Sequence, residues 1–261
     1  MTSPVPSTAR RGALLVVPNT LDFGTAGEPA PLDDLLPIGV IRIAARLRHW
    51  VCENAKTTRA FLKRVDAVSP LGCALQGLAI VELPRPRKGA KDGGANDPSA
   101  LLAPALAGHE LGLLSEAGLP ALADPGATLV AAAHAAGLPV SVLPGASSIA
   151  MALAASGLNG QSFAFVGYVP IDAEARRDRI RSLEAHSRRD GQTQVLIETP
   201  YRNAALLDSL LAHLDPRTML AVGAALSLPG AFTRTDSVAG WRRRPAPLDP
   251  DIPAVFSFLA Q

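Results

Sequence analysis

Residues 115–126 read Ser-Glu-Ala-Gly-Leu-Pro-Ala-Leu-Ala-Asp-Pro-Gly, a loop rich in glycine and proline that holds two acids. Residues 110–114 before it, which are apolar after Glu110, are typical of a buried strand, and residues 128–136 after it are typical of a helix. Glycine lets the backbone approach a ligand closely, while Asp124 and Pro125 suit the N-cap and the first turn of a helix. The stretch therefore predicts a strand–loop–helix unit whose acids either serve a ligand or only cap the helix.

Strands and helices alternate on both sides of this unit. The other predicted strands are short apolar runs at residues 13–17, 78–83, 140–143, 163–166, 195–198, 219–222 and 254–259. The other predicted helices cover residues 148–155, 173–186 and 203–213, and residues 37–50 begin as a helix and run into a strand. Such alternation predicts an α/β fold with mostly parallel sheets, in which ligands bind beyond the carboxyl ends of the strands.

The composition is that of a globular chain with nearly balanced charge. The 261 residues carry 25 Lys and Arg against 23 Asp and Glu, a net charge of +2, and 48% of them are hydrophobic. These values exclude a disordered chain and give no basic footprint that would hold it on nucleic acid by charge alone. A local run such as Arg242–Arg244 is still available for phosphate contacts. Cys52 and Cys73 exclude a disulfide framework and lack the spacing of a redox or zinc motif.

Residues 125–171 contain no Asp, Glu, Lys or Arg, but glycines and prolines divide them into pieces shorter than a membrane span of about 20 residues. Arg10 and Arg11 precede an apolar run that is shorter than a signal peptide requires. We therefore expect no membrane association and a cytoplasmic location. Residues 83–98 combine prolines, glycines and charges, which predicts an exposed, mobile loop.

A second loop, residues 143–148, again lies between a predicted strand and a predicted helix. Free N–H groups at a helix start favour an anion, but Ser147 and Ser148 equally suit the plain role of N-cap. The chain has no P-loop, no Gly-x-Gly-x-x-Gly fingerprint and no Gly-x-Ser-x-Gly elbow. Its five histidines are widely spaced, so we expect no metal site.

Five segments at ordered spacing carry a family resemblance. Residues 115–126 are similar to Ser-Asp-Ala-Gly-Thr-Pro-x-x-x-Asp-Pro-Gly, and residues 143–158 to Pro-Gly-x-x followed by a helix and Ser-Gly-Leu. Residues 167–170, 198–202 and 53–58 are similar to Gly-Phe-x-Pro, Glu-Ser-Pro-His-Arg and Glu-Asp-Thr-Arg-x-Thr. Together they resemble the tetrapyrrole methylases, a class of S-adenosylmethionine-dependent methyltransferases. Within that family they resemble the ribosomal RNA small subunit methyltransferase I branch, which 2′-O-methylates a cytidine of 16S rRNA.

The resemblance implies two α/β domains, residues 1–160 and 161–261, with S-adenosylmethionine bound in a cleft between them. It also implies a homodimer and an RNA partner, 16S rRNA. The cofactor-binding residues that it implies are Ser115, Glu116, Ala117, Gly118, Leu119, Pro120, Ser147, Ser148, Tyr168, Glu198, Thr199, Pro200, Ala224, Leu226, Ser227, Ile252, Pro253 and Ala254.

Methyl transfer to a ribose hydroxyl benefits from a base within reach of that hydroxyl. Three acids are candidates for the base, namely Glu53, Glu116 and Asp124. Each also has a structural alternative, as a salt-bridge partner, an acceptor that orders the loop, or a helix cap. We expect Asp124 to be the cap, which leaves Glu53 and Glu116 as the predicted catalytic residues.

The segments nearer a substrate depart from the pattern of that branch. Residues 18–24 replace a Thr-Pro-Ile-Gly-Asn-Leu loop, and Asn54 and Lys56 replace an aspartate and an arginine. Residues 223–227 have lost every charge of an Arg-Glu-Leu-Thr-Lys segment, and residues 252–254 replace Lys-Gly-Glu. Three hypotheses follow in this order: an RNA 2′-O-methyltransferase, a methyltransferase for a tetrapyrrole or another small molecule, and an inactive relative that only binds the cofactor.

Overall fold

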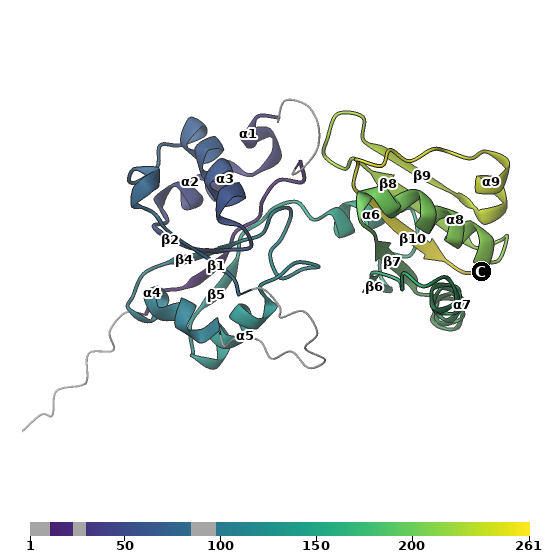
Figure 1. Ribbon diagram of the computed structural model, residues 1–261, viewed down its shortest axis with the longest axis horizontal. Helices are drawn as coiled ribbons and strands as arrows, with labels where there is room; N and C mark the ends of the chain where they lie inside the picture. Colours follow the sequence, from purple (N-terminus) through teal and green to yellow (C-terminus); the bar gives the residue numbers. More distant parts are fainter. Residues whose placement is uncertain (1–10, 23–29, 85–97) are drawn as a thin grey trace, which may run out of the picture. The chain divides into compact units, whose positions relative to one another are not determined.

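The structure, a computed structural model, describes residues 11–22, 30–84 and 98–261. The chain forms two compact units, the first extending to Ala146 and the second beginning at Ser147 (Figure 1). This division lies before the predicted domain boundary at residue 160. The reason is that helix α6 (Ser148–Ser156) packs on the strands of the second unit.

The first unit contains a five-stranded sheet in the order β3-β2-β4-β1-β5. All of its pairs are parallel, as the sequence predicts. The strands are β1 (Leu14–Val16), β2 (His49–Cys52), β3 (Ala79–Glu82), β4 (Leu111–Leu114) and β5 (Val140–Val142). Because every pair is parallel, the loops that leave the carboxyl ends of these strands meet at one edge of the sheet.

Helices cover both faces of this sheet (Figure 1). One face is covered by α1 (Leu32–Leu35), α2 (Ile38–Arg46), α3 (Ala55–Val68) and the short η1 (Leu75–Gly77). The other face is covered by η2 (Pro98–Leu102), α4 (Ala103–Leu106) and α5 (Ala127–Ala135). Alternate residues of β1 therefore pack into two different cores, which explains why this strand reads as a continuous apolar run.

The second unit contains another five-stranded sheet, in the order β6-β7-β10-β8-β9. Its strands are β6 (Phe163–Gly167), β7 (Thr193–Ile197), β8 (Met219–Ala224), β9 (Phe232–Ser237) and β10 (Ala254–Leu259). Only β6 and β7 are parallel, and the other three pairs are antiparallel. The prediction of a mostly parallel sheet is therefore wrong for this unit. A short β8–β9 connection makes a hairpin, and β10 then inserts between β7 and β8.

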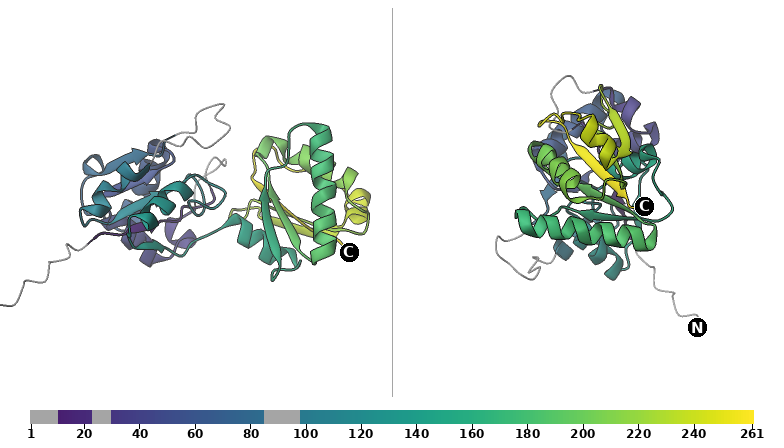
Figure 2. Two further views of the ribbon diagram at one scale, coloured as in Figure 1. Left: turned by 90° about the horizontal axis from the view of Figure 1, so that it is seen from below. Right: turned by 90° about the vertical axis from the view of Figure 1, so that its right-hand side faces the viewer.

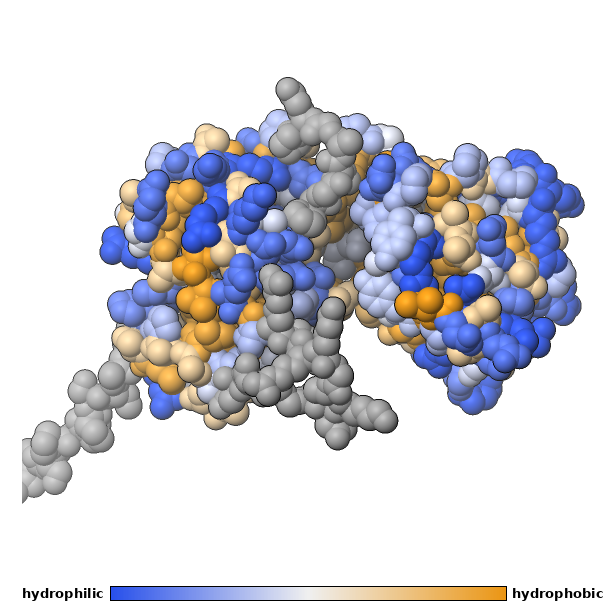
Figure 3. Space-filling model, in the orientation of Figure 1, coloured by the Kyte–Doolittle hydropathy of each residue, from blue (hydrophilic) through white to orange (hydrophobic). Residues whose placement is uncertain are grey.

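Figure 2 shows the long helix α7 (Ala173–Asp190) lying along this second sheet. With α8 (Asn203–His213) and α9 (Val238–Arg243) it covers one face, while α6 covers the other. The region that α7 occupies is hydrophilic on its outer side in Figure 3, as its many arginines require. In the described part of the chain, no helix has both the length and the hydropathy of a membrane span.

Several elements were not anticipated from the sequence. The helix α3, the strand β9 and the helix α9 have no predicted counterpart. The strand β9 reads Phe-Thr-Arg-Thr-Asp-Ser, so hydropathy gives no signal for it, and the arginine and the aspartate form an ion pair. The predicted mobile loop at residues 83–98 lies outside the described residues except at its ends.

Gly112 offers a test of packing in the first unit. It lies opposite Trp50 in the β2–β4 pair, and a Cβ at Gly112 would approach a ring carbon of Trp50 to 2.7 Å. Since Trp50 is buried, we expect Gly112→Ala to lower the free energy of unfolding by about 1–3 kcal/mol. The control is Gly39→Ala within α2, where a Cβ meets nothing, and a gain of about 0.5–1 kcal/mol is expected. Urea denaturation monitored by circular dichroism measures both, and equal effects of the two variants would contradict the packing argument.

Candidate functional site

Asn19, three residues after β1, holds the loop at residues 115–120, which leaves the carboxyl end of β4. The side-chain amide of Asn19 donates hydrogen bonds to the carbonyl oxygens of Ser115 and Glu116, both at 3.0 Å. The backbone N–H of Asn19 donates to the carbonyl oxygen of Gly118 at 2.8 Å. Because Asn19 is buried, these bonds fix the backbone of the predicted cofactor loop.

The interior of this loop depends on glycine. Gly118 has a φ of +64°, and its N–H donates to the carbonyl oxygen of Thr20 at 3.2 Å. A Cβ at Gly118 would lie 3.4 Å from the side chain of Leu21. The hydroxyl of Ser115 donates to the carbonyl oxygen of Ala117 at 2.9 Å, so the loop also bonds to itself.

Three acids face one another beside this loop. The backbone N–H of Glu116 donates to Oε2 of Glu53 at 3.2 Å, and the hydroxyl of Thr57 donates to Oε1 of Glu116 at 3.4 Å. The third acid, Asp124, lies close enough to interact with both glutamates and with the side chain of Ser115. The two predicted catalytic residues are therefore brought together, and Asp124 joins them.

The pKa of Asp124 is raised to about 6, first by burial and then by the negative charges of Glu53 and Glu116. The polar side chain of Ser115 opposes this rise. A carboxyl group that titrates near neutral pH is a better proton acceptor than an ordinary aspartate. Asp124 is therefore suited to accept a proton near neutral pH.

The prediction that Asp124 caps the following helix is wrong. Helix α5 begins at Ala127, its N-cap is Gly126 with a φ of +130°, and no side chain caps it. The left-handed residues Ala121 and Ala123 turn the chain before this point. The carboxyl group of Asp124 therefore does not cap α5, and it is available to the cluster of acids.

The start of α3 explains one departure from the family pattern. Asn54 is the N-cap of this helix, and its side chain accepts hydrogen bonds from the N–H groups of Lys56 at 2.9 Å and Thr57 at 3.4 Å. Asparagine and aspartate cap helices about equally well. The replacement of aspartate by Asn54 therefore keeps the helix in place while it removes one charge.

The second predicted loop contributes a backbone contact and a cap. A Cβ at Gly145 would lie 2.2 Å from Cβ of Pro18, so only glycine fits beside the residues that follow β1. Ser147 is the N-cap of α6, and its hydroxyl accepts from the N–H of Ala150 at 3.5 Å. Ser148 is the first residue of that helix. Both serines belong to the second unit.

The remaining predicted cofactor residues gather at one edge of the second sheet. Tyr168 follows β6, Glu198 follows β7, and Ala224 ends β8 opposite Ala254 at the start of β10. The N–H of Ala225 donates to the carbonyl oxygen of Pro253 at 3.2 Å, which joins residues 224–227 to residues 252–254. This edge therefore contains every predicted residue of the second unit apart from Ser147 and Ser148.

Two buried polar residues support this edge. The Glu198 side chain is buried, pairs with Arg202 at 3.0 Å and accepts from the N–H of Thr199 at 2.9 Å. Asn203 is fully buried, and its amide donates to the carbonyl oxygen of Ile252 at 3.0 Å. No described residue donates to Oδ1 of Asn203. Asn203 and Asn19 were not predicted as site residues. Asn203 lies just beyond a motif segment, and Asn19 lies in a segment that departs from the family pattern.

The loops at these two edges contain residues other than glycine with left-handed backbone conformations. Among the described residues, four residues other than glycine have φ between +52° and +66°. They are Ala121, Ala123, Ala225 and Ser227. Such conformations cost on the order of 1 kcal/mol each and persist where the surroundings over-determine them, often at functional sites.

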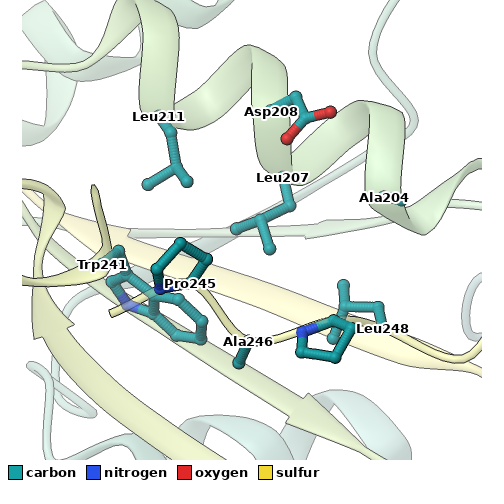
Figure 4. A pocket seen from close by; sticks show the side chains of 9 residues that line it. Ala204, Leu207, Asp208, Leu211, Trp241, Pro245, Ala246 and Leu248 are labelled. Atoms are coloured by element: carbon teal, nitrogen blue, oxygen red, sulfur yellow. The ribbon is translucent and has the colours of Figure 1, made fainter. Parts of the chain in front are cut away.

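A cavity of about 280 Å³ lies elsewhere in the second unit, between α8, Trp241 and residues 245–248. Figure 4 shows Leu207 and Leu211 pointing from α8 toward Trp241 and Pro245. None of the predicted site residues lines it. Across the described ranges, no group of three or more His, Cys, Asp or Glu side chains is arranged to hold a metal ion.

Comparison with known proteins identifies the family. The sequence profile of the tetrapyrrole (corrin/porphyrin) methylases matches residues 31–239, most of the chain and parts of both units. The protein belongs to this family.

Two solved structures share the fold at low sequence identity. Uroporphyrin-III C-methyltransferase from Thermus thermophilus, complexed with S-adenosylhomocysteine, is 19% identical with a TM-score of 0.52, and covers 95% of this chain and 97% of its own. The conserved hypothetical protein APE0931 from Aeropyrum pernix K1 is 15% identical with a TM-score of 0.58, and covers 96% and 85%.

A more similar sequence is that of ribosomal RNA small subunit methyltransferase I from Xylella fastidiosa. It is 41% identical over 105 residues, which are 40% of this chain and 37% of the relative. The match thus spans well under half of the relative's length.

The raised pKa of Asp124 predicts how stability changes with pH. The unfolded carboxyl group titrates near its ordinary value of 3.8 and the folded one near 6, so the folded state binds the proton more tightly. Its contribution to stability is therefore full below about pH 4 and is lost as the pH rises through 6. We expect Asp124→Asn to raise stability at pH 7.5 by on the order of 1 kcal/mol, since the group is partly screened by solvent, and to leave it unchanged at pH 4.

Urea denaturation at pH 4.0, 5.0, 6.0 and 7.5 measures this effect. The control is Asp208→Asn at an exposed position of α8. A wild-type pH profile that Asp124→Asn leaves unaltered would refute the buried titration.

Proposed function

We propose that the protein is an S-adenosylmethionine-dependent methyltransferase whose acceptor is a ribose 2′-hydroxyl of ribosomal RNA. The family match and the name of the Xylella relative support this assignment. The structural observation that carries it is the position of the motif segments. In each unit they lie together at one edge of the sheet, and the strained residues lie in or beside them.

The residues of the first unit fit a cofactor of this charge. The cofactor supplies an activated methyl group on a positively charged sulfur. Glu53, Glu116 and Asp124 together make the surroundings of the loop at residues 115–120 negative, which favours a cation. The buried hydrogen bonds of Asn19 hold that loop rigid, so little reorganisation is required when a ligand binds.

The residues of the second unit would contact the cofactor mainly through backbone. Residues 224–227 and 252–254 carry no ionisable side chain, and they are joined by a backbone hydrogen bond. Contacts of this kind tolerate changes of side chain. They are therefore compatible with the loss of the charged side chains that the ribosomal RNA methyltransferase branch carries in these two segments. The orphaned Oδ1 of Asn203 adds a buried acceptor beside the second segment. We propose that the loops at each of these two edges contribute residues to the cofactor site.

Asp124 is the residue that we assign to the acceptor's proton, because burial and the negative charges of Glu53 and Glu116 raise its pKa. A ribose hydroxyl must lose its proton as it attacks the methyl group. With a pKa of about 6, Asp124 is mostly ionised at neutral pH and still retains appreciable basicity. This assignment extends the predicted pair of catalytic acids to a cluster of three.

A small-molecule acceptor is the second candidate. The family is described by corrin and porphyrin substrates, and the uncharged residues 223–227 replace a segment that is charged in the RNA-modifying branch. An apolar acceptor would be compatible with this loss of charge.

We further propose that the protein acts in the cytoplasm and as a homodimer, because the family resemblance implies both.

Titration calorimetry with S-adenosylhomocysteine tests the cofactor site. We expect wild-type protein to bind and Gly118→Arg to lose at least about 100-fold in affinity, because Gly118 has a φ of +64° that arginine rarely adopts and the long side chain would occupy space beside the loop. The control is Gly160→Arg, an exposed glycine around which a Cβ meets nothing. Thermal melts establish that both variants are folded. Absence of binding by folded wild-type protein would overturn the enzyme assignment.

Transfer of a labelled methyl group tests the acceptor. The substrates are 30S subunits that lack the modification, free ribosomal RNA and a uroporphyrinogen, each with labelled S-adenosylmethionine. We expect label on a cytidine ribose of the 30S subunit, and a rate that Asp124→Asn lowers by about 100-fold or more. Label on the uroporphyrinogen alone would replace the RNA assignment by the second candidate. Cofactor binding without any transfer would instead identify an inactive relative.

A further inference from the structure

A charged groove lies in the first unit at the end of the sheet opposite to the motif loops. It has a volume of about 480 Å³ and is formed where α2 ends and where β2, β3 and β4 begin. Its lining residues are Arg46, Leu47, Arg48, His49, Gly77, Ala79, His109 and Glu110. None of them belongs to the motifs on which the proposed function rests.

The positive charge in this groove exceeds the negative charge. Arg46 forms two hydrogen bonds with the carboxylate of Glu110, and this pair cancels in charge. Arg48 is exposed and makes no ion pair with any described residue. Gly77 and Ala79, from the segment that includes β3, contribute no side-chain charge. The groove is therefore left with one uncompensated guanidinium group beside two histidines.

The two histidines are close together and differ in exposure. The rings of His49 and His109 have their centroids 5.0 Å apart and are tilted by 38°. His49 is half-buried, and its pKa is lowered by burial, by the neighbouring His109 and by Arg48. Protonation of His49 is thus opposed by other positive groups, and a bound anion would remove that opposition.

We propose that this groove binds a phosphate group, held by Arg48 together with the ring nitrogens of His49 and His109. Arginine recognises phosphate oxygens through a planar set of N–H donors, and a protonated histidine adds charge-assisted hydrogen bonds. Arg46 and Glu110 form one wall of the groove, and the salt bridge between them neutralises the charge of Glu110.

Binding of the anion and protonation of the histidines are linked. An anion favours the charged imidazolium, so it raises the pKa of His49 and protons are taken up on binding. Affinity must therefore increase as the pH falls. Arg48 remains charged throughout, and its contribution is independent of pH over this range.

Sulfate is the first probe, because it stays a dianion between pH 5.5 and 8.0 and any pH dependence then comes from the protein. We expect NMR titration of wild-type protein to show tighter binding at pH 5.5 than at pH 8.0 by about tenfold or more, with a raised pKa for His49 and shifted ring signals of both histidines. Arg48→Gln should weaken binding at both pH values, and His109→Gln should flatten the pH dependence. Arg42→Gln, at an exposed position of α2 outside the groove, should change neither.

Unchanged histidine signals at saturating sulfate would overturn the proposal, as would equal weakening by Arg48→Gln and Arg42→Gln. Inorganic phosphate and a short single-stranded oligoribonucleotide then identify the source of the group. Displacement of sulfate by the oligoribonucleotide assigns the groove to an RNA backbone, whereas displacement by phosphate alone assigns it to a free phosphate compound. Neither result depends on methyl transfer, so the groove and the proposed function are tested separately.

Discussion

The buried amide of Asn19 is the interaction on which the geometry of the first unit's edge depends. A single side chain binds two successive carbonyl groups of the loop after β4, and its backbone adds a third bond. Parallel strands deliver their loops to a common edge, but they do not fix the distance between loops. The Asn19 hydrogen bonds provide that constraint. The close packing of Gly145 on Pro18 then places the following loop against the same residues.

The second unit reaches a comparable result with different topology. Its sheet is mostly antiparallel, yet the start of β10 pairs with the ends of β7 and β8, so the important segments still meet at one edge. Left-handed backbone at Ala225 and Ser227 then shapes the turn after β8. The two units thus arrive at loop-lined edges by separate routes. What they have in common is strained backbone with small side chains at the point where a ligand would approach.

Sequence reasoning predicted the parts of the fold that depend on hydropathy and on turn residues. The strands of the first unit and the helices α6, α7 and α8 are confirmed within a few residues. Strand β9 was missed, because its charged residues are satisfied by an Arg234–Asp236 pair that only the folded chain contains. The antiparallel order was missed because local patterning does not specify the partner of a strand.

The role of Asp124 was misjudged for a similar reason. A cap and a free carboxyl group look alike until the start of α5 is known, and that start lies three residues later, at Ala127. The motif order did predict the family, since it samples both units along most of the chain.

The cluster of Glu53, Glu116 and Asp124 also bears on turnover. On the proposed placement of the cofactor, these carboxylates attract a sulfonium ion before transfer. After transfer the sulfur is a neutral thioether, and that attraction is gone. The same three side chains would then favour exchange of the spent cofactor for a fresh one, so the electrostatics of the loop would limit inhibition by the product.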